Sequence, residues 1–414
     1  MLILQRSKNF WLKLTLFFGV IGPGIITALA NNDAGGISTY SIVGAHYGTQ
    51  MLWVLFLVTI SLAITQEMGM RIGLVTRQGL SGVIRENFGL RWTAFAMITM
   101  LITNLGTMAS EFSGIAASFE IIGINKYLTV PVAALVIWLV LYKGSFKTTQ
   151  KIFLAFSALF VVYIINGFFI KPDFGQAITA LVTPSIQWNT PFLITMIALI
   201  GTTITPWGQF FIQSYVVDKG LDEKNYKSGK FEAYLASFFA SFVAFFIIIS
   251  TATVLNKNGI DIHDAKDAAL ALKPLVGNFA QFLFAFGLFC ASMLGAFILP
   301  VATAYVICEA FGWEYGFNTT WKNGKFFYSF ILISIILPAL VVLIPGVSLI
   351  NIMLHAQNVN GMLLPIILIF VMKIINNKKI MGEHVNGPLG NAVAWLTIAG
   401  IILATIILVA SSFI

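Results

Sequence analysis

The chain has 414 residues, of which 58% are hydrophobic and only 10% are charged. A soluble domain of this length could not tolerate that balance on its surface, so the composition indicates a protein that crosses a membrane many times. The net charge of +8 is scattered over short loops rather than gathered on one face, which argues against nucleic acid as a partner.

Residues 1–14 form a short basic tail without a cleavable signal sequence, and we expect this tail to lie in the cytoplasm. Cys290 and Cys308 both fall in apolar segments, so neither a disulfide framework nor a thiolate metal site is expected. No phosphate loop, nucleotide fingerprint or zinc-ligand cluster occurs in the sequence. We therefore expect neither an enzyme nor a cofactor nor a primary pump.

Apolar stretches bounded by charged residues or by Gly, Pro and Asn predict eleven membrane spans. In chain order they are 15–46, 51–75, 92–122, 128–142, 152–170, 191–217, 232–255, 276–308, 326–344, 348–372 and 391–412. The first, third and eighth exceed what a perpendicular helix needs, so we expect them to be interrupted, tilted or projecting from the bilayer.

The positions of the basic residues predict the orientation of these spans. A cytoplasmic N-terminus assigns 19 of the 24 lysines and arginines to the inside and puts the C-terminus outside. The longest loop, 256–274, is too short to fold alone. We therefore expect a single multi-pass domain, 1–414, in the lipid bilayer of the cytoplasmic membrane, and we expect a monomer.

Asp33 stands in an apolar segment beside Gly35 and Gly36. An ionisable residue at bilayer depth is costly unless it is compensated, so it marks a functional site by default. A broken helix frees main-chain carbonyls that a bound cation can use. We therefore predict that the first span breaks between Asp33 and Gly36.

The sixth span contains a second predicted break. Pro206 cannot donate its amide and clashes with the preceding turn, so the helix should break at Thr205-Pro206. Each interrupted helix is the first of a group of five spans, and the two groups are 15–170 and 191–372. Because five is an odd number, the two groups must cross the membrane in opposite orientations. Such paired breaks predict an all-α 5+5 inverted repeat with a substrate site near the midplane, and 391–412 becomes an accessory eleventh helix.

Further polar residues lie within the spans. Glu111 shares a helical face with Thr107 and Ser118, and we interpret it as a counter-charge or as the carboxylate of a water-filled cavity. Glu67 and Arg71 are spaced i, i+4 and should pair near the cytoplasmic end of the second span. A gate that breaks on opening is the alternative interpretation of that pair.

Several motifs resemble the Nramp (natural-resistance-associated macrophage protein) family of divalent metal transporters. They are Gly22-Pro23-Gly24, Asp33-Ala34-Gly35-Gly36, Gly44-Ala45-His46-Tyr47-Gly48, Thr205-Pro206-Trp207 and the stretch 356–365. The resemblance runs through the first ten spans in order and implies a LeuT-like fold. In the family, helix 1 carries Asp-Pro-Gly-Asn and helix 6 carries Met-Pro-His. Metal is held there by the Asp, the Asn, the Met sulfur, main-chain carbonyls and a Gln of helix 10.

The resemblance implies a set of metal-binding positions in this chain. They are the side chains of Asp33, Thr205 and Gln357, the position of Gly36, and the main-chain carbonyls of Ala30 and Thr202. Gly36 stands where the family has Asn, and Thr205 stands where it has Met. Asn360, three residues from Gln357, is expected to share its face beside a break region in helix 10.

Two family positions linked to proton movement are also altered. Trp207 replaces the helix 6 His, and Met108 replaces one of two relay carboxylates in helix 3, which leaves Asp33 and Glu111 as the expected carriers. We therefore expect proton coupling to be weak or absent.

With the Thr205 hydroxyl in place of the Met thioether of the family, the site would be built only of oxygen ligands. Such a site favours hard cations, so we expect magnesium or manganese, and the chain is similar to the divergent Nramp-related proteins that are associated with magnesium. A carrier of an organic solute that has lost the metal site is the main alternative. A non-transporting sensor or scaffold is a further one.

Overall fold

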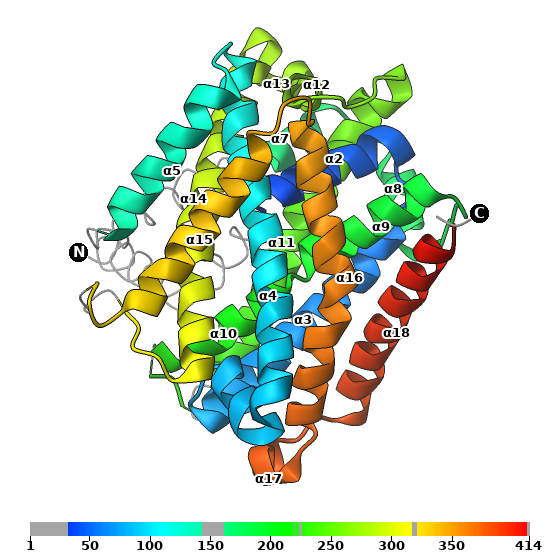
Figure 1. Ribbon diagram of the computed structural model, residues 1–414. Helices are drawn as coiled ribbons and strands as arrows, with labels where there is room; N and C mark the ends of the chain where they lie inside the picture. Colours follow the sequence, from blue (N-terminus) through cyan, green and yellow to red (C-terminus); the bar gives the residue numbers. More distant parts are fainter. Residues whose placement is uncertain (1–31, 143–160, 219, 223–225, 317–320, 412–414) are drawn as a thin grey trace, which may run out of the picture.

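The computed structural model of this protein describes residues 32–142, 161–218, 220–222, 226–316 and 321–411. All regular secondary structure in these residues is helical (Figure 1). Eight stretches of the described chain are long and apolar enough to cross a membrane. The prediction of an all-α membrane protein is confirmed. The tail 1–14, most of the first span and much of the fifth lie outside the described residues.

The longer helices correspond to the predicted spans, and short helices occupy the connections. The longer ones are α2 (Ala34–Tyr47), α3 (Leu52–Thr76), α4 (Leu80–Ile121), α5 (Lys126–Tyr142), α7 (Val161–Phe169), α9 (Thr190–Thr203), α10 (Pro206–Asp218), α11 (Tyr226–Val254), α14 (Ala280–Phe311), α15 (Lys325–Val342), α16 (Leu349–Ile375) and α18 (Pro388–Ser411). The short ones are α8 (Phe174–Val182), α12 (Ala265–Ala269), α13 (Lys273–Val276) and α17 (Lys378–Met381).

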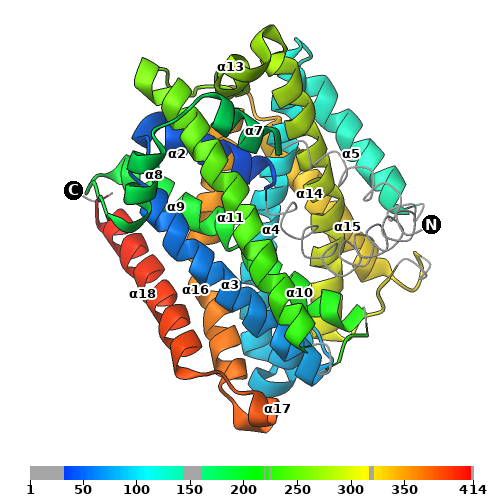
Figure 2. The ribbon, with the colours of Figure 1, turned by 180° about the vertical axis from the view of Figure 1, so that it is seen from behind.

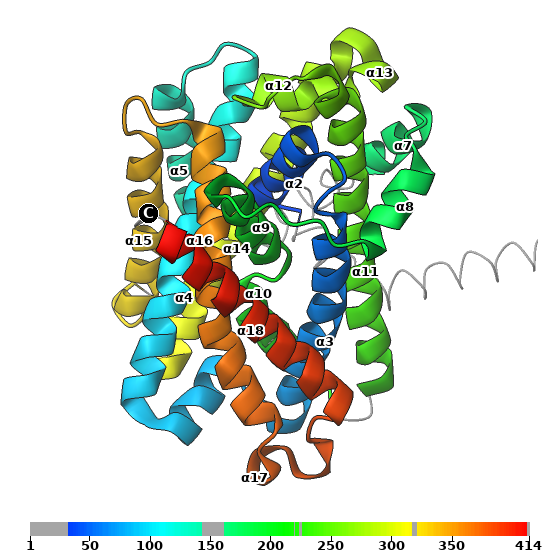
Figure 3. The same cartoon turned by 90° about the vertical axis from the view of Figure 1, so that its right-hand side faces the viewer.

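The helices α2, α9 and α10 lie inside the bundle, enclosed by other helices of the predicted spans (Figure 3). α2 packs on α11, α9 and α16, while α10 packs on α3 and α4. The last helix, α18, lies at the periphery against α16, α3 and α9 (Figures 1 and 2). The interruption between α9 and α10 at the centre, with continuous helices around it, is the arrangement expected of a LeuT-like fold.

The periphery of the bundle exposes large apolar side chains. Leu396 on α18 is 72% exposed, and Trp92 on α4 and Leu135 on α5 are each 57% exposed. A soluble monomer rarely leaves so many such side chains in water. These faces therefore fit contact with lipid.

The break in the sixth span lies where the sequence places it. α9 ends at Thr203, Ile204 has an extended backbone with φ −113° and ψ 91°, and α10 begins at Pro206. Pro206 is the first residue of its helix, where a missing amide costs nothing. The prediction of a discontinuous sixth span is confirmed.

The first span is described only from Asn32 onward, and its helical part begins directly after Asp33. Asp33 is the N-cap of α2, and Gly35 and Gly36 lie inside the first helical turn. The two glycines therefore do not interrupt the helix. α2 begins directly after Asp33, because a short polar side chain that accepts an amide hydrogen bond is a strong N-cap.

Two other expectations are corrected. The connection before the third span contains an additional short helix, which α4 includes and which has Arg85 and Glu86 on its exposed face. Gly89, with a non-helical φ of 77° that favours glycine, separates this short helix from the membrane-spanning part, which starts close to the predicted residue 92. α16 is one continuous helix with Pro365 inside it, so helix 10 has no break beside Asn360.

α9 and α16 approach each other unusually closely. A methyl group on Gly201 would lie 2.1 Å from the main-chain oxygen of Gln357, and one on Gly361 would lie 2.4 Å from that of Ile197. Small residues permit such contact between helices in a membrane. The close approach brings Gln357 beside the end of α9.

Candidate metal site at the helix breaks

The Asp33 carboxylate lies at the N-terminal end of α2 and is 5% exposed. Its Oδ1 accepts a hydrogen bond from the Gly36 amide at 2.7 Å. The positive end of the helix dipole stabilises a negative charge at this position. Gly36 thus contributes its main-chain amide to the site and holds the carboxylate that the sequence singled out.

Gly35 makes room for the helix 10 glutamine. A methyl group at residue 35 would lie 1.8 Å from Nε2 of Gln357 and 2.8 Å from Oγ of Ser110. Only the absence of a side chain lets these two groups approach the first turn of α2. The structure therefore brings Gln357 next to Asp33, as the resemblance implied.

Asn360 holds the other end of the Gln357 amide. Its Nδ2 donates to Oε1 of Gln357 at 2.9 Å and to Oγ1 of Thr107, also at 2.9 Å. Within the described residues Gln357 Nε2 has no hydrogen-bond partner. The side chain of Gln357 is therefore fixed by α4 through Asn360, and its free amide hydrogens face α2.

The end of α9 contributes hydroxyls and carbonyls. Thr202 and Thr205 are 1% and 3% exposed, and Thr202 Oγ1 has no hydrogen-bond partner in the described part of the chain. Tyr40 on α2 and Thr203 on α9 share a hydrogen bond of 3.3 Å between their hydroxyls, which joins the two half-helices. The last carbonyls of α9 carry the negative end of its dipole. Ala30 lies outside the described residues.

Glu111 is a second buried carboxylate next to the first. It is completely buried on α4 and interacts with the Asp33 side chain and with the main chain of Ala34. Its carboxyl group packs against Gly295 of α14, where an added methyl would lie 2.5 Å from Cδ. Neither ion pair in the described part of the chain involves Asp33 or Glu111. The site therefore gathers two carboxylates without a basic partner.

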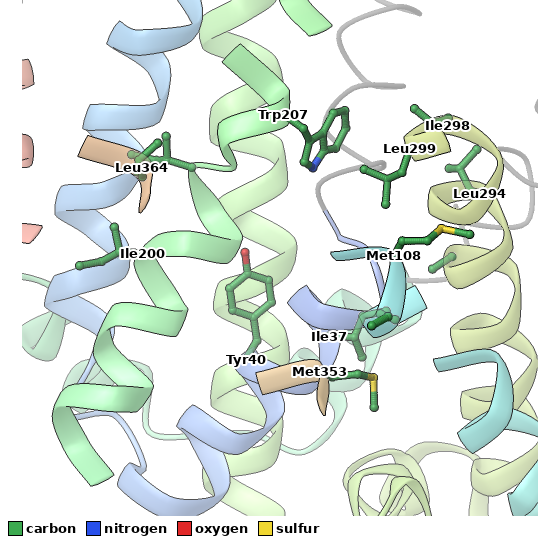
Figure 4. Packing of buried hydrophobic residues seen from close by; sticks show 14 of the residues in the cluster. Ile37, Tyr40, Met108, Ile200, Trp207, Leu294, Ile298, Leu299, Met353 and Leu364 are labelled. Carbon is green, nitrogen blue, oxygen red and sulfur yellow. The ribbon is translucent and has the colours of Figure 1, made fainter. Parts of the chain in front are cut away.

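Met108 and Trp207 are apolar at the positions where the family has titratable groups. They are 0% and 4% exposed and belong to the main hydrophobic core. Figure 4 shows Trp207 near Leu299 and Met108 near Leu294. The Trp207 ring also packs edge-on against Phe211 with centroids 5.7 Å apart. Neither residue can bind or release a proton.

The predicted ion pair of Glu67 and Arg71 forms, with 3.0 Å between Oε2 and Nη2. It lies towards the end of α3, away from Asp33, and is part of a larger network that the sequence did not reveal. Tyr226 donates to Glu67 Oε1 at 2.7 Å, and Arg71 donates to Asn386 Oδ1 at 2.7 Å. Arg71 also donates to the main-chain oxygens of His384 and Val385, both at 3.3 Å. The network joins α3 to α11 and to the segment before α18.

Sequence reasoning also missed several polar residues near the breaks, including Tyr40, Thr203 and Ser110. Their signal in the sequence is weak, because single hydroxyl residues are common in membrane helices, where they often bond their own backbone. Only the meeting of α2, α4 and α9 shows that they share one region.

The helix breaks and the polar groups around them define a membrane transporter of the LeuT-like fold. The chain belongs to the Nramp family: the model for natural resistance-associated macrophage protein-like proteins matches residues 24–411.

Curated relatives have similar sequences, and solved structures share the fold. The divalent metal cation transporter MntH of Yersinia pestis is 24% identical over 378 residues, which cover 89% of this chain and 88% of the relative. MntH of Caldanaerobacter subterraneus is 23% identical, with 98% of this chain and 95% of the relative covered. Among structures, the manganese transporter of Eremococcus coleocola has a TM-score of 0.78 at 18% identity, covering 97% of this chain and 87% of that one. MhsT in complex with L-phenylalanine has a TM-score of 0.62 at 14% identity, covering 94% and 98%.

Proposed function

We propose that this protein carries a divalent metal cation, magnesium or manganese, across the cytoplasmic membrane. The observation that carries the proposal is the pair of buried carboxylates, Asp33 and Glu111, for which the described residues supply no basic partner. Two carboxyl groups buried side by side at bilayer depth are costly to ionise, and a bound cation would reduce that cost. An anionic solute would be repelled from the same place.

The ligands around Asp33 support a hard cation. The oxygen donors available are the Asp33 carboxylate, the Thr202 and Thr205 hydroxyls, and the Gln357 amide after rotation away from Asn360. Carboxylate, carbonyl and hydroxyl oxygens suit Mg²⁺ and Mn²⁺, and Mg²⁺ keeps several waters when only one or two carboxylates are present. The names of the relatives, a divalent metal cation transporter and a manganese transporter, favour the same class of substrate.

Alternating access around the helix breaks is the mechanism we infer. The half-helices α2, α9 and α10 end at the site, so each can tilt without breaking a continuous helix. The Tyr40–Thr203 hydrogen bond would move α2 and α9 together, and α10 would move separately across the non-helical residues Ile204 and Thr205. In this scheme the N-terminus is cytoplasmic, and the membrane potential drives cation entry by about 2.3 kcal/mol per charge per 100 mV.

Uptake into proteoliposomes tests the proposal. Under an inside-negative potential, Mn²⁺ and Mg²⁺ should enter vesicles that contain the protein, and empty vesicles should remain impermeable. The melting temperature of the detergent-solubilised protein should rise with the same ions, because a ligand that binds only the folded state stabilises it. If no divalent cation enters the vesicles and none stabilises the protein, the proposal of metal transport is wrong. Uptake of an organic amine would then favour the alternative substrate class.

A further inference from the structure

Three glutamines follow the interface between α3 and α10. Gln66 lies on α3, and Gln209 and Gln213 lie four residues apart on α10, so these two share a helical face. We call Gln66, Gln209 and Gln213 the glutamine row. The row is not part of the metal site at the helix breaks.

The row starts beside that site and leads away from it. A methyl group on Gly208 would lie 2.9 Å from Thr205 Oγ1 and 3.5 Å from Gln66 Nε2, so the first glutamine is a neighbour of Thr205. One turn further along α3, a methyl group on Gly69 would lie 4.0 Å from Cγ of Gln213. The row therefore runs from Thr205 towards the end of α3, where Glu67 and Arg71 form their network.

The row is buried, and most of its amide atoms have no partner among the described residues. Gln209 and Gln213 are 0% exposed and Gln66 is 6% exposed. In the described part of the chain, neither the amide nitrogen nor the amide oxygen of Gln209 or Gln213 has a hydrogen-bond partner, and Oε1 of Gln66 has none either. Buried amides without partners cost free energy that leucine or methionine at the same positions would not cost.

We propose that the glutamine row is a transit site for the partly hydrated cation between the metal site and the end of the molecule at which α3 ends. Amide oxygens can replace water around a hard cation, and amide hydrogens can bond the waters that remain. Glutamine does not titrate, so the row can pass a hydrated ion without exchanging protons. The inference rests on the proposed transport of a divalent cation and adds the route by which that cation leaves.

Leucine variants separate transit from packing. Gln209→Leu and Gln213→Leu keep the volume and remove the unpaired amides, so the melting temperature should stay level or rise. The initial rate of Mn²⁺ uptake should nevertheless fall on the order of tenfold, the effect of losing one favourable polar contact on the path. Binding of Mn²⁺ at the central site, measured by thermal shift, should be unchanged. Gln281→Leu, at an exposed position of α14, is the matched control and should transport like the wild type.

Cysteine labelling gives a second measurement that needs no transport. Gln209→Cys and Gln213→Cys are made after replacing Cys290 and Cys308 with alanine, and vesicles are treated with a membrane-impermeant thiol reagent. Both cysteines should react with the reagent when it is added on the side at which α3 ends. Saturating Mn²⁺ should change the rate of this labelling.

The two proposals fail in different ways. No cation uptake or binding by the wild type would count against the proposed function. Uptake by the wild type together with unchanged rates in both leucine variants, or cysteines that react from neither side, would overturn the transit site.

Discussion

The side chain of Gln357 reaches so close to Gly35 that a methyl group at residue 35 would lie 1.8 Å from Nε2. The continuous helix α16 thereby contacts the first turn of the half-helix α2. Gln357 is in turn fixed to α4 through Asn360 and Thr107. One residue of the predicted metal site is thus held by helices from both halves of the chain.

Gly35→Ala should disturb this contact. The added methyl cannot be accommodated without moving Gln357 or α2, and overpacking of this kind costs about 1–3 kcal/mol. We expect a lower melting temperature and weaker stabilisation by Mn²⁺. Gly400→Ala on α18 is the control, because nothing lies within 4 Å of a methyl group there, and it should be neutral or stabilising. Equal behaviour of the two variants would contradict the close contact.

The buried pair of Glu67 and Arg71 should be important for stability. Both side chains are at most 10% exposed, and removing one charge of such a pair leaves the other uncompensated. Arg71→Leu should therefore destabilise the protein by about 3–5 kcal/mol. Thermal or chemical unfolding in detergent measures this loss.

A double-mutant cycle with Tyr226 tests the same network. Tyr226→Phe removes a 2.7 Å hydrogen bond to a charged group and should cost about 1.5–3 kcal/mol. In the Glu67→Gln background the same change should cost clearly less, because the acceptor is no longer charged. Additive effects would show that Tyr226 and Glu67 act independently.

Metal uptake should proceed with little movement of protons. The positions of the two missing relay groups are occupied by Met108 and Trp207, which are buried and cannot titrate. A pH-sensitive dye inside the vesicles should therefore show much less than one proton per cation. Acidification that follows the metal gradient and disappears in Glu111→Gln would show that the remaining carboxylates suffice for coupling.

The sequence predicted the parts of the fold that depend on composition and on residues with strong backbone preferences. Pro206 placed the break of the sixth span correctly, and the apolar runs gave most helices within a few residues. The short helix before Gly89 was not predicted, although charged residues such as Arg85 and Glu86 are tolerated on an exposed helical face. The division into two inverted repeats stays a prediction.

The site was less accessible to sequence reasoning than the fold. Asp33 stood out because its charge is rare in an apolar segment, but the role of the two glycines was misjudged: they form the first turn of α2, and the contact of Gly35 with Gln357 depends on packing between distant helices. The same holds for Tyr226 and Asn386 in the Glu67–Arg71 network and for the glutamine row, since no local pattern shows which polar residues will meet.

The charge of Asp33 is the most direct test of the proposed metal transport. Asp33→Asn removes the charge but keeps a side-chain oxygen that can cap α2, so the fold should be retained. We predict that this variant melts within a few degrees of the wild type, that Mn²⁺ and Mg²⁺ no longer raise its melting temperature, and that uptake into proteoliposomes falls to the level of empty vesicles. Uptake of either ion by Asp33→Asn at the wild-type rate would contradict the assignment of Asp33 as the central metal ligand.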